Sequence, residues 1–432
     1  METEAFTILK NNPNLRIILL VPENKGDFFS EEFGGQNVVV EEVPFKKMSK
    51  LNLVFHLLSW NLLFNHSKKI HKMVQLGKSR NRLRYWFTSV LSWCGRLPLV
   101  RKIFRWLDYR LMPGGGYDDL FNKYQPAAVF ASDIQDLRIQ EYSDTYLVRE
   151  ARRHGIPSIG MSRSWDSMTT KGLLRTLPDT LVVQNEWIRA WAFEYHSVPV
   201  QSIMVVGLPH YDHYLKGVRT PRDQFFNKLG LDPNRKMIFV TPPSDIWTGD
   251  TSFNTYLLKV LESVDEQVVV RFPIFGGAEL GGYKPPGHIV FDTPSRASRL
   301  EESLLRRSDD EHLADLLYYS DVVVTSPSSI VLDAAVFGKP TILIGFDGVK
   351  LKPFWDSLRR YYDYEHQQAV IKEGSLKIAE TPEEMTAFIR QYLINPEGQK
   401  DNERRIAERA CYRLDGKSGE RLANLIIKHL NT

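Results

Sequence analysis

Short apolar runs alternate with amphipathic stretches along most of the chain. In the first half these runs are Arg16–Pro22, Asn37–Val43, Ala127–Ser132, Ile156–Met161, Thr180–Gln184 and Ser202–Val206. The same rhythm resumes at Lys236–Thr241, Gln267–Phe272, Ile289–Phe291, Asp321–Thr325 and Thr341–Ile344. Short continuous apolar runs bounded by turn residues are typical of strands buried in parallel sheets. The alternation predicts an α/β protein with two mostly parallel, doubly wound sheets.

A polar segment from Tyr214 to Arg235, rich in Gly and Pro, separates the two halves. We therefore expect an N-terminal Rossmann-like domain over residues 1–214 and a C-terminal one over residues 235–395. Helices over residues 396–432 are expected to pack back towards the first domain. Two such domains, facing across a cleft, would place a ligand at the carboxyl ends of their strands.

The stretch from about residue 50 to 112 departs from the alternation. It predicts helices that carry Trp60, Trp86, Trp93 and Trp106, and residues 67–110 contain twelve Lys/Arg against one acid, Asp108. The whole chain has a net charge of only +4, so the positive charge is local. One interpretation is a helical insertion with tryptophans in its core and solvated cations. The other is an amphipathic platform on an anionic membrane surface, where Trp suits the interface. No pattern indicates nucleic-acid binding.

Composition narrows the class of protein. The 432 residues are 43% hydrophobic and 25% charged, with two cysteines, as in globular proteins without a disulfide framework. The longest apolar-rich stretch, Leu51–Phe64, is too short to span a bilayer, and the N-terminus lacks the pattern of a signal peptide. We expect a cytoplasmic protein, associated peripherally with the inner face of the plasma membrane.

The densest chemistry lies in residues 315–348. A predicted strand ends in the turn Thr325-Ser326-Pro327-Ser328-Ser329, which opens a helix. Hydroxyls, backbone N–H groups and a helix N-terminus together suit a phosphate or diphosphate. The plain alternative is an N-cap with core residues behind it. Pro242, in Thr241-Pro242-Pro243-Ser244, ends another strand at the same edge and is a second candidate for lining a nucleotide.

This segment resembles the carboxyl-terminal half of GT-B-fold glycosyltransferases. The resemblance is strongest to the branch with CDP-glycerol glycerophosphotransferases and capsule-type transferases that share a Ser-Ser motif. The matching residues are Ser328, Ser329, Asp333, Gly338, Lys339 and Pro340. The resemblance implies a nucleotide-diphosphate site with these residues. Retaining GT-B enzymes commonly carry two glutamates eight positions apart here, but this chain has Thr325 and Asp333.

Related transferases also carry a basic residue and a His-Pro pair near the nucleotide. Here the strand ends in Arg271-Phe272-Pro273, so the histidine is replaced. Arg271 is a candidate phosphate ligand, because a guanidinium suits bidentate contact. A surface arginine at a strand end is the plain alternative.

The segment Ser162–Gly172 follows a predicted strand and is rich in reactive side chains. Arg163, Trp165, Thr170 and Lys171 are candidates for substrate binding, with Trp165 suited to stack on a sugar. Asp166 is a candidate base for an acceptor hydroxyl, if burial raises its pKa. Asp133 competes for that role, and His210, in Gly207-Leu208-Pro209-His210, is a further catalytic candidate. The alternative is a structured loop in which Asp166 caps a turn and Trp165 packs in the core.

No metal or cofactor motif is present, so we expect a metal-independent enzyme without a cofactor. The sequence and the resemblance together predict a glycosyltransferase of bacterial surface glycan synthesis. It would move a sugar or polyol phosphate from a nucleotide-activated donor to a lipid-linked or polysaccharide acceptor. The alternatives are an enzyme like the nucleotide-sugar 2-epimerases and a non-catalytic scaffold that binds carbohydrate or lipid.

Overall fold

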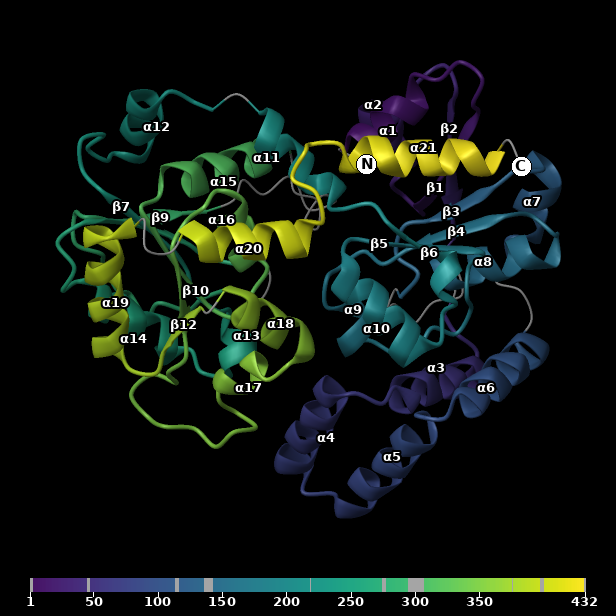
Figure 1. Ribbon diagram of the computed structural model, residues 1–432, viewed down its shortest axis with the longest axis horizontal. Coiled ribbons are helices and arrows are strands. Elements are labelled where there is room, and N and C mark those ends of the chain that lie inside the picture. The colour runs from purple at the N-terminus through teal and green to yellow at the C-terminus, as the bar shows by residue number, and fades with distance from the viewer. Residues whose placement is uncertain are drawn as a thin grey trace. The chain divides into compact units, whose positions relative to one another are not determined.

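A computed structural model describes residues 3–44, 47–112, 116–135, 143–217, 219–273, 277–293, 307–374, 376–396 and 400–430. The chain forms two compact units (Figure 1). Unit 1 comprises Met1–His213 and Ala410–Thr432, and unit 2 comprises Tyr214–Arg409. The polar segment after Tyr214 is therefore part of unit 2, because Phe225 and Phe226 in it are fully buried in that unit's core.

Unit 1 contains two parallel sheets. Strands β1 (Ile17–Pro22) and β2 (Val38–Val43) pair with each other, while β3 (Val129–Ala131), β4 (Ser158–Met161), β5 (Thr180–Val183) and β6 (Ile203–Val205) pair in sequence order. We expected one sheet, and the difference lies between β1 and β3. Leu20 and Val43 pack against the cluster that contains Val129, but the structure joins the two groups by packing rather than by a hydrogen-bonded ladder.

Helices connect the strands of unit 1. They are α1 (Glu4–Lys10), α2 (Gly26–Phe33), α7 (Asp118–Tyr124), α8 (Asp144–Arg153), α9 (Ser167–Thr170) and α10 (Glu186–His196), with short 3-10 turns at Val200–Ser202 and Pro209–Tyr211. The last helix, α21 (Ser418–Leu430), lies beside α1, and Leu422 and Ala423 share a buried cluster with Ala5 (Figure 1).

The helical insertion between β2 and α7 consists of four helices, which we call the α3–α6 insertion. They are α3 (Lys50–Leu62), α4 (His66–Ser79), α5 (Arg82–Cys94) and α6 (Pro98–Leu111). Local sequence explains where they begin. Ser49, Asn65 and Asn81 each accept a backbone N–H of the first turn of α3, α4 and α5, and α6 starts at a proline, which suits the first helical position.

Unit 2 is built on one six-stranded parallel sheet. Its strands are β7 (Met237–Thr241), β8 (Gln267–Arg271), β9 (Ile289–Asp292), β10 (Val322–Thr325), β11 (Thr341–Ile344) and β12 (Lys377–Ala379), in the order β9-β8-β7-β10-β11-β12. This is the 3-2-1-4-5-6 order of a doubly wound Rossmann sheet. The expected doubly wound fold is confirmed for this unit, and the order reverses between β7 and β10.

The helices of unit 2 are α11 (Asp212–Lys216), which begins at the boundary, and then α12 (Arg222–Leu229), α13 (Asp245–Thr248), α14 (Ser252–Leu261), α15 (Arg307–Tyr319), α16 (Ile330–Val336), α17 (Arg359–Tyr362), α18 (Glu365–Gly374), α19 (Pro382–Ile394) and α20 (Lys400–Cys411), which ends in unit 1.

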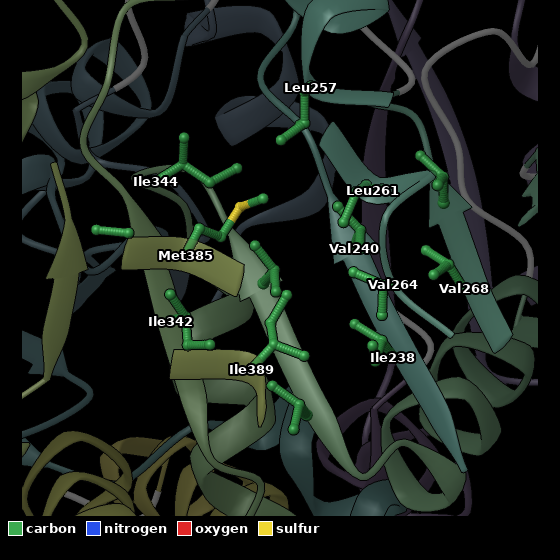
Figure 2. Packing of buried hydrophobic residues seen from close by; sticks show 14 of the residues in the cluster. Ile238, Val240, Leu257, Leu261, Val264, Val268, Ile342, Ile344, Met385 and Ile389 are labelled. Atoms are coloured by element: carbon green, nitrogen blue, oxygen red, sulfur yellow. The ribbon is translucent and has the colours of Figure 1, made fainter. Parts of the chain in front are cut away.

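Helices cover both faces of the unit 2 sheet. Alternate side chains of each strand point to opposite faces, so each face packs against its own set of helices. Ile238 and Val240 face a cluster with Leu257 of α14 and Ile389 of α19, as Figure 2 shows. Phe239 faces the other cluster, which includes residues of α12, α15 and α16. Both faces of the strands are thus apolar, as the continuous apolar runs predicted.

No helix among the described residues is long and apolar enough to cross a membrane. Cys94 and Cys411 are both free thiols.

Candidate functional site

The sheet of unit 2 reverses its strand order between β7 and β10, and a row of hydroxyls lies at that point. The last residues of these strands, Thr241 and Thr325, are register partners. The Thr241 hydroxyl donates to the Thr325 hydroxyl at 2.6 Å, and Thr325 lies 3.0 Å from the Ser328 hydroxyl. Ligands of doubly wound sheets bind beyond the carboxyl ends of the strands at such a reversal. The turn singled out in the sequence therefore lies where this fold binds ligands.

The other predicted members of the turn differ in exposure. Ser326 is buried, and its N–H donates to the Thr241 carbonyl at 3.2 Å. Ser328 is half-buried, and Ser329 is exposed at the start of α16 with no side-chain capping bond. Pro242 is buried directly after β7. The structure thus brings Pro242, Thr325, Ser326 and Ser328 together at one edge.

Two buried polar atoms near this edge lack a hydrogen-bond partner among the described residues. They are the Ser244 hydroxyl, three residues beyond β7, and Oδ1 of Asn254 in α14. The Asn254 amide nitrogen donates to the Pro243 carbonyl at 3.0 Å, which ties this side chain to the same loop. An unsatisfied buried polar atom costs about 1–3 kcal/mol, so both atoms suit a polar ligand group. Sequence reasoning missed Asn254, since nothing local distinguishes it.

Arg271 lies at the end of β8, where its guanidinium forms a buried ion pair with Asp292, its register partner on β9. The His312 ring donates from Nε2 to the other Asp292 oxygen at 2.9 Å. Burial opposes ionisation of Asp292, but the His312 hydrogen bond and the Arg271 charge outweigh it and lower the Asp292 pKa. Arg271 is therefore already paired with a carboxylate, which competes with the predicted phosphate contact.

Asp333 points to a different part of unit 2. Its carboxylate accepts the Tyr214 hydroxyl at 2.8 Å, and both side chains are buried. Burial first, and then the Asp333 charge, raise the pKa of Tyr214 well above its usual value. This contact fixes the beginning of unit 2 to α16.

The Gly338-Lys339-Pro340 motif lies at the amino end of β11, opposite the hydroxyl turn. Gly338 has a φ of +61°, and the Lys339 N–H donates to the Ala334 carbonyl at 2.9 Å, so the glycine ends α16 in a left-handed turn. Burial lowers the pKa of Lys339. Within this motif, the glycine has a clear structural role in turning the chain.

In unit 1, the structure brings together two predicted residues at the carboxyl edge of β3 and β4. The Lys171 ammonium lies 3.4 Å from Asp133, and both side chains are mostly buried. Asp144 of α8 holds the same loop through the Asp133 backbone N–H. A candidate base and a candidate substrate-binding residue thus form an ion pair.

The Asp166 side chain makes its hydrogen bonds within its own loop. Its carboxylate accepts the hydroxyls of Ser164 and Thr170, the latter at 2.8 Å, and its carbonyl accepts the Thr170 N–H as α9 begins. Trp165 is partly buried against a core cluster, whereas Arg163 is exposed. This geometry is that of the structured loop given above as the alternative.

His210 is exposed on a 3-10 turn, and its ring lies 5.1 Å from the His213 ring. The structural role in this segment belongs to Asp212, which sequence reasoning overlooked. Its two carboxylate oxygens accept the N–H groups of Ser418 (3.0 Å) and Gly419 (2.7 Å), at the start of α21. Asp212 therefore holds the last helix to unit 1.

The basic tract divides into buried and exposed cations. Lys68, Lys72 and Arg101 are buried and Arg105 is half-buried, while the other eight of the twelve are exposed. Arg101 and Arg105 donate to carbonyls at the end of α10, including Glu194 at 2.6 Å, and so attach α6 to that helix. The one acid, Asp108, is fully buried between Arg149 (2.8 Å) and Arg175 (2.6 Å).

Most tryptophans of the insertion lie at the surface, so the interpretation that placed them all in a core is wrong. Trp86 is 66% exposed, Trp93 61% and Trp106 58%. Only Trp60 is partly covered, and the buried Lys68 ammonium lies 3.3 Å from the centre of its ring. Exposed apolar residues follow a helical stripe on α5, at Leu83, Trp86, Phe87, Val90 and Trp93.

One group of potential metal ligands exists among the described residues, namely the exposed Asp118 and His154 with the buried Glu150. The His154 imidazole already contacts Asp118 at 2.9 Å. Burial, the largest effect, raises the pKa of Glu150. We interpret this group as a surface ion-pair network.

Comparison with protein families supports the resemblance seen in the sequence. Residues 287–428 match the family CDP-Glycerol:Poly(glycerophosphate) glycerophosphotransferase. The resemblance is confirmed over this third of the chain. The matched region includes the hydroxyl turn and β10 to β12, and it supports a transferase. No curated protein matches the chain significantly in sequence.

Solved structures show the fold. A crystal structure of Arabidopsis thaliana UGT89C1 overlaps with a TM-score of 0.54, at 12% identity, over 99% of this chain and 95% of that one. This likeness supports a GT-B-like fold. Two others overlap more weakly. They are a Neisseria meningitidis UDP-GlcNAc 2-epimerase bound to UDP-GlcNAc (0.49, 11%, 95% and 99%) and the wall teichoic acid polymerase TagF (0.42, 13%, 71% and 73%).

Proposed function

We propose that this protein is a GT-B-type transferase of bacterial surface glycan synthesis. It moves a sugar or polyol phosphate from a nucleotide-activated donor to a lipid-linked or polysaccharide acceptor. The observation that carries the proposal is the hydroxyl row at the strand-order reversal of unit 2, of which Thr325 and Ser328 lie inside the region that matches a glycerophosphotransferase family.

Unit 2 binds the donor in this proposal. Ser326, Ser328 and Ser329 supply hydroxyl and N–H groups for the diphosphate, while Thr241 and Thr325 hold the turn in shape from behind. The unpartnered Ser244 hydroxyl and Asn254 carbonyl take polar groups of the nucleotide. Hydrogen-bond donors that are already oriented before the reaction stabilise the negative charge that develops on the leaving diphosphate. The proposal includes neither a metal nor a cofactor. The metal-independence is tested by measuring turnover in excess EDTA, which should be unchanged.

Unit 1 binds the acceptor. Asp133 is the better candidate base of the two carboxylates, because Asp166 accepts hydroxyls of its own loop. Lys171 beside Asp133 then positions the acceptor. Arg163 is exposed and free to contact the substrate, and His210 lies on another turn. An epimerase would act on the nucleotide-sugar alone, so turnover that requires an added acceptor distinguishes the two enzymes.

Nucleotide binding tests the donor site. UDP, CDP, GDP and CMP are screened for an increase in the thermal midpoint of the full chain, since a ligand at 100 times its Kd stabilises by about 2.7 kcal/mol. We expect one of them to stabilise the protein, and Ser328→Ala to reduce that effect. Ser263→Ala, an exposed serine in the same unit, is the matched control. Absence of any shift in folded protein contradicts both enzyme proposals and favours the scaffold.

The α3–α6 insertion brings the enzyme to its acceptor on the inner face of the plasma membrane. The apolar stripe of α5, with exposed Leu99, Ile103 and Trp106 on α6, lies among eight exposed cations. Such cations contribute about 1 kcal/mol each near an anionic surface, and Trp favours the interface.

Co-sedimentation with phosphatidylglycerol vesicles measures this attachment. We expect Trp86→Ser with Trp93→Ser to abolish it, and Phe193→Ser, an exposed aromatic elsewhere on unit 1, to leave it intact. If the wild type does not bind vesicles but forms dimers that Trp86→Ser dissociates, the stripe is a protein interface instead.

A further inference from the structure

A pocket in unit 1 lies between α3 and the loops at the carboxyl edge of β3 and β4. Its wall includes His56 and Trp60 of α3, Gln135 after β3, and Thr145, Tyr146 and Arg175. The lining contains a guanidinium and an imidazole but no carboxylate. Met48 and Leu173 add apolar surface. The lining of this pocket suits a small polar ligand, and the only charge in it is positive.

The charge beneath the pocket is unbalanced. Two guanidiniums, Arg149 and Arg175, share the single carboxylate of Asp108, and all three are buried. Since arginine stays ionised in proteins, this group carries one net positive charge. The positive charge also affects His56. Burial lowers the pKa of His56 most, and the charges of Arg175 and Lys68 lower this pKa further. A buried excess cation favours an anion in the adjoining space.

A helix end adds to this potential. Ser143, Thr145 and Tyr146 line the pocket from the first turn of α8, a ten-residue helix. Ser143 occupies the capping position, but its side chain makes no capping bond. The positive end of a helix attracts phosphate through its N–H groups. Nearby carboxylates are already engaged, since Asp133 pairs with Lys171 and Asp144 binds the Asp133 N–H.

Gln135 adds a polar group to the lining of the pocket. Gln135 is 6% exposed, and its amide nitrogen donates to the Gly172 carbonyl at 3.0 Å. Its Oε1 atom is buried and makes no hydrogen bond among the described residues. Reversing the amide would set two carbonyl oxygens against each other, so Oε1 is the amide atom without a donor in the described part of the chain. A hydroxyl of the ligand supplies one.

We propose that this pocket binds a phosphate ester that carries a free hydroxyl, with Arg175, His56 and the amino end of α8 holding the phosphate and Gln135 accepting the hydroxyl. The site deepens the proposed function, on which its biological role rests, because it would hold the phosphate-bearing part of the acceptor. Binding itself requires no donor nucleotide, so it is measured separately from the activity of unit 2.

Methyl NMR of methionine-labelled full-length protein reports on the pocket directly. The Met48 signal, assigned with Met48→Leu, should shift on addition of ribose 5-phosphate, while those of exposed Met73 and of Met237 in the unit 2 core stay in place. Methyl phosphate, which lacks a hydroxyl, should bind more weakly, and ribose without phosphate should not bind. No Met48 shift with any phosphate overturns the proposal, whatever the result at unit 2.

A charge placed in the pocket provides the second test. Gln135→Glu should weaken ribose 5-phosphate at least about tenfold, whereas Gln201→Glu, the same change at an exposed position of unit 1, should not. Equal affinity in both variants contradicts the assignment. If Gln135→Glu does not fold, the wild-type Met48 shifts decide alone. Soluble dihexanoyl phosphatidylglycerol identifies the source, because tighter binding than ribose 5-phosphate indicates a lipid headgroup and weaker binding a sugar phosphate.

Discussion

The carboxyl edges of the parallel sheets in the two units are built from different groups. In unit 2 the point where the strand order reverses is lined by neutral hydroxyls from Thr241, Thr325 and Ser328, which bond to one another, while the buried Arg271–Asp292 ion pair lies at the ends of β8 and β9. In unit 1 the edge is charged, with Asp133 paired to Lys171 above a buried group of Asp108, Arg149 and Arg175. Burying a hydroxyl costs less free energy than burying an ion, and a buried ion that loses its partner is strongly destabilising. Removing one partner should therefore cost more in the charged group of unit 1 than in the hydroxyl row of unit 2.

The largest effect should follow removal of the shared carboxylate. Asp108→Asn leaves two buried guanidiniums without their counter-ion, and breaking a buried pair costs about 3–5 kcal/mol. Urea unfolding should show that loss, while Glu31→Gln, at an exposed acid of α2, should change stability by less than about 0.5 kcal/mol. A loss below about 1 kcal/mol for Asp108→Asn would remove the basis of the comparison.

A buried acid of unit 2 should make the stability of the protein depend on pH. Glu403 in α20 is buried with Oε2 unpartnered, and burial raises its pKa to about 7. Below pH 4.5 both folded and unfolded chains are protonated there. As the pH rises to 7 only the unfolded chain loses the proton, so stability falls. Glu403→Gln should therefore stabilise the protein at pH 8, by roughly 3 kcal/mol at most, and have no effect at pH 4.

Thermal midpoints across this pH range measure the Glu403 effect. The exposed Glu408, on the same helix, supplies the control variant Glu408→Gln. Equal stabilisation of Glu403→Gln at pH 4 and pH 8 would mean that titration of this carboxyl is not the cause.

A smaller effect is expected for the hydroxyl row itself. Thr325→Val keeps the shape of a fully buried side chain but leaves the Thr241 hydroxyl without its acceptor, at a cost of about 1–3 kcal/mol. Equilibrium unfolding in urea measures this loss, and calorimetry measures the loss of nucleotide affinity that the proposed donor site predicts. A cost as large as that of Asp108→Asn would show that the two edges do not differ in the way described.

Local sequence patterns predicted much of the fold. The runs Lys236–Thr241 and Asp321–Thr325 contain β7 and β10, and the helices expected over about residues 50–112 are present as α3 to α6. The hydroxyl turn was also recognised, because all of its chemistry lies within five consecutive residues.

Partners distant in sequence could not be predicted. Arg271 and Asp333 looked available for phosphate, yet their partners, Asp292 and Tyr214, lie 21 and 119 positions away. Burial of a charge is a property of three-dimensional packing, so the sequence did not separate Arg101 from the exposed Lys102 beside it. The sequence also could not decide where the tryptophans lie, because a tryptophan side chain suits either a core or a surface.

The return of α21 to unit 1 has a consequence for how the protein is made. This helix packs on α1 and is held by Asp212, yet all of unit 2 is translated between them. A ribosome adds roughly 5–20 residues per second, so the early unit waits on the order of 10–40 seconds for its last helix. During that interval the apolar surface around Ala5 is not covered by α21. Synthesis of unit 2 is therefore completed before that of unit 1, although unit 1 begins first.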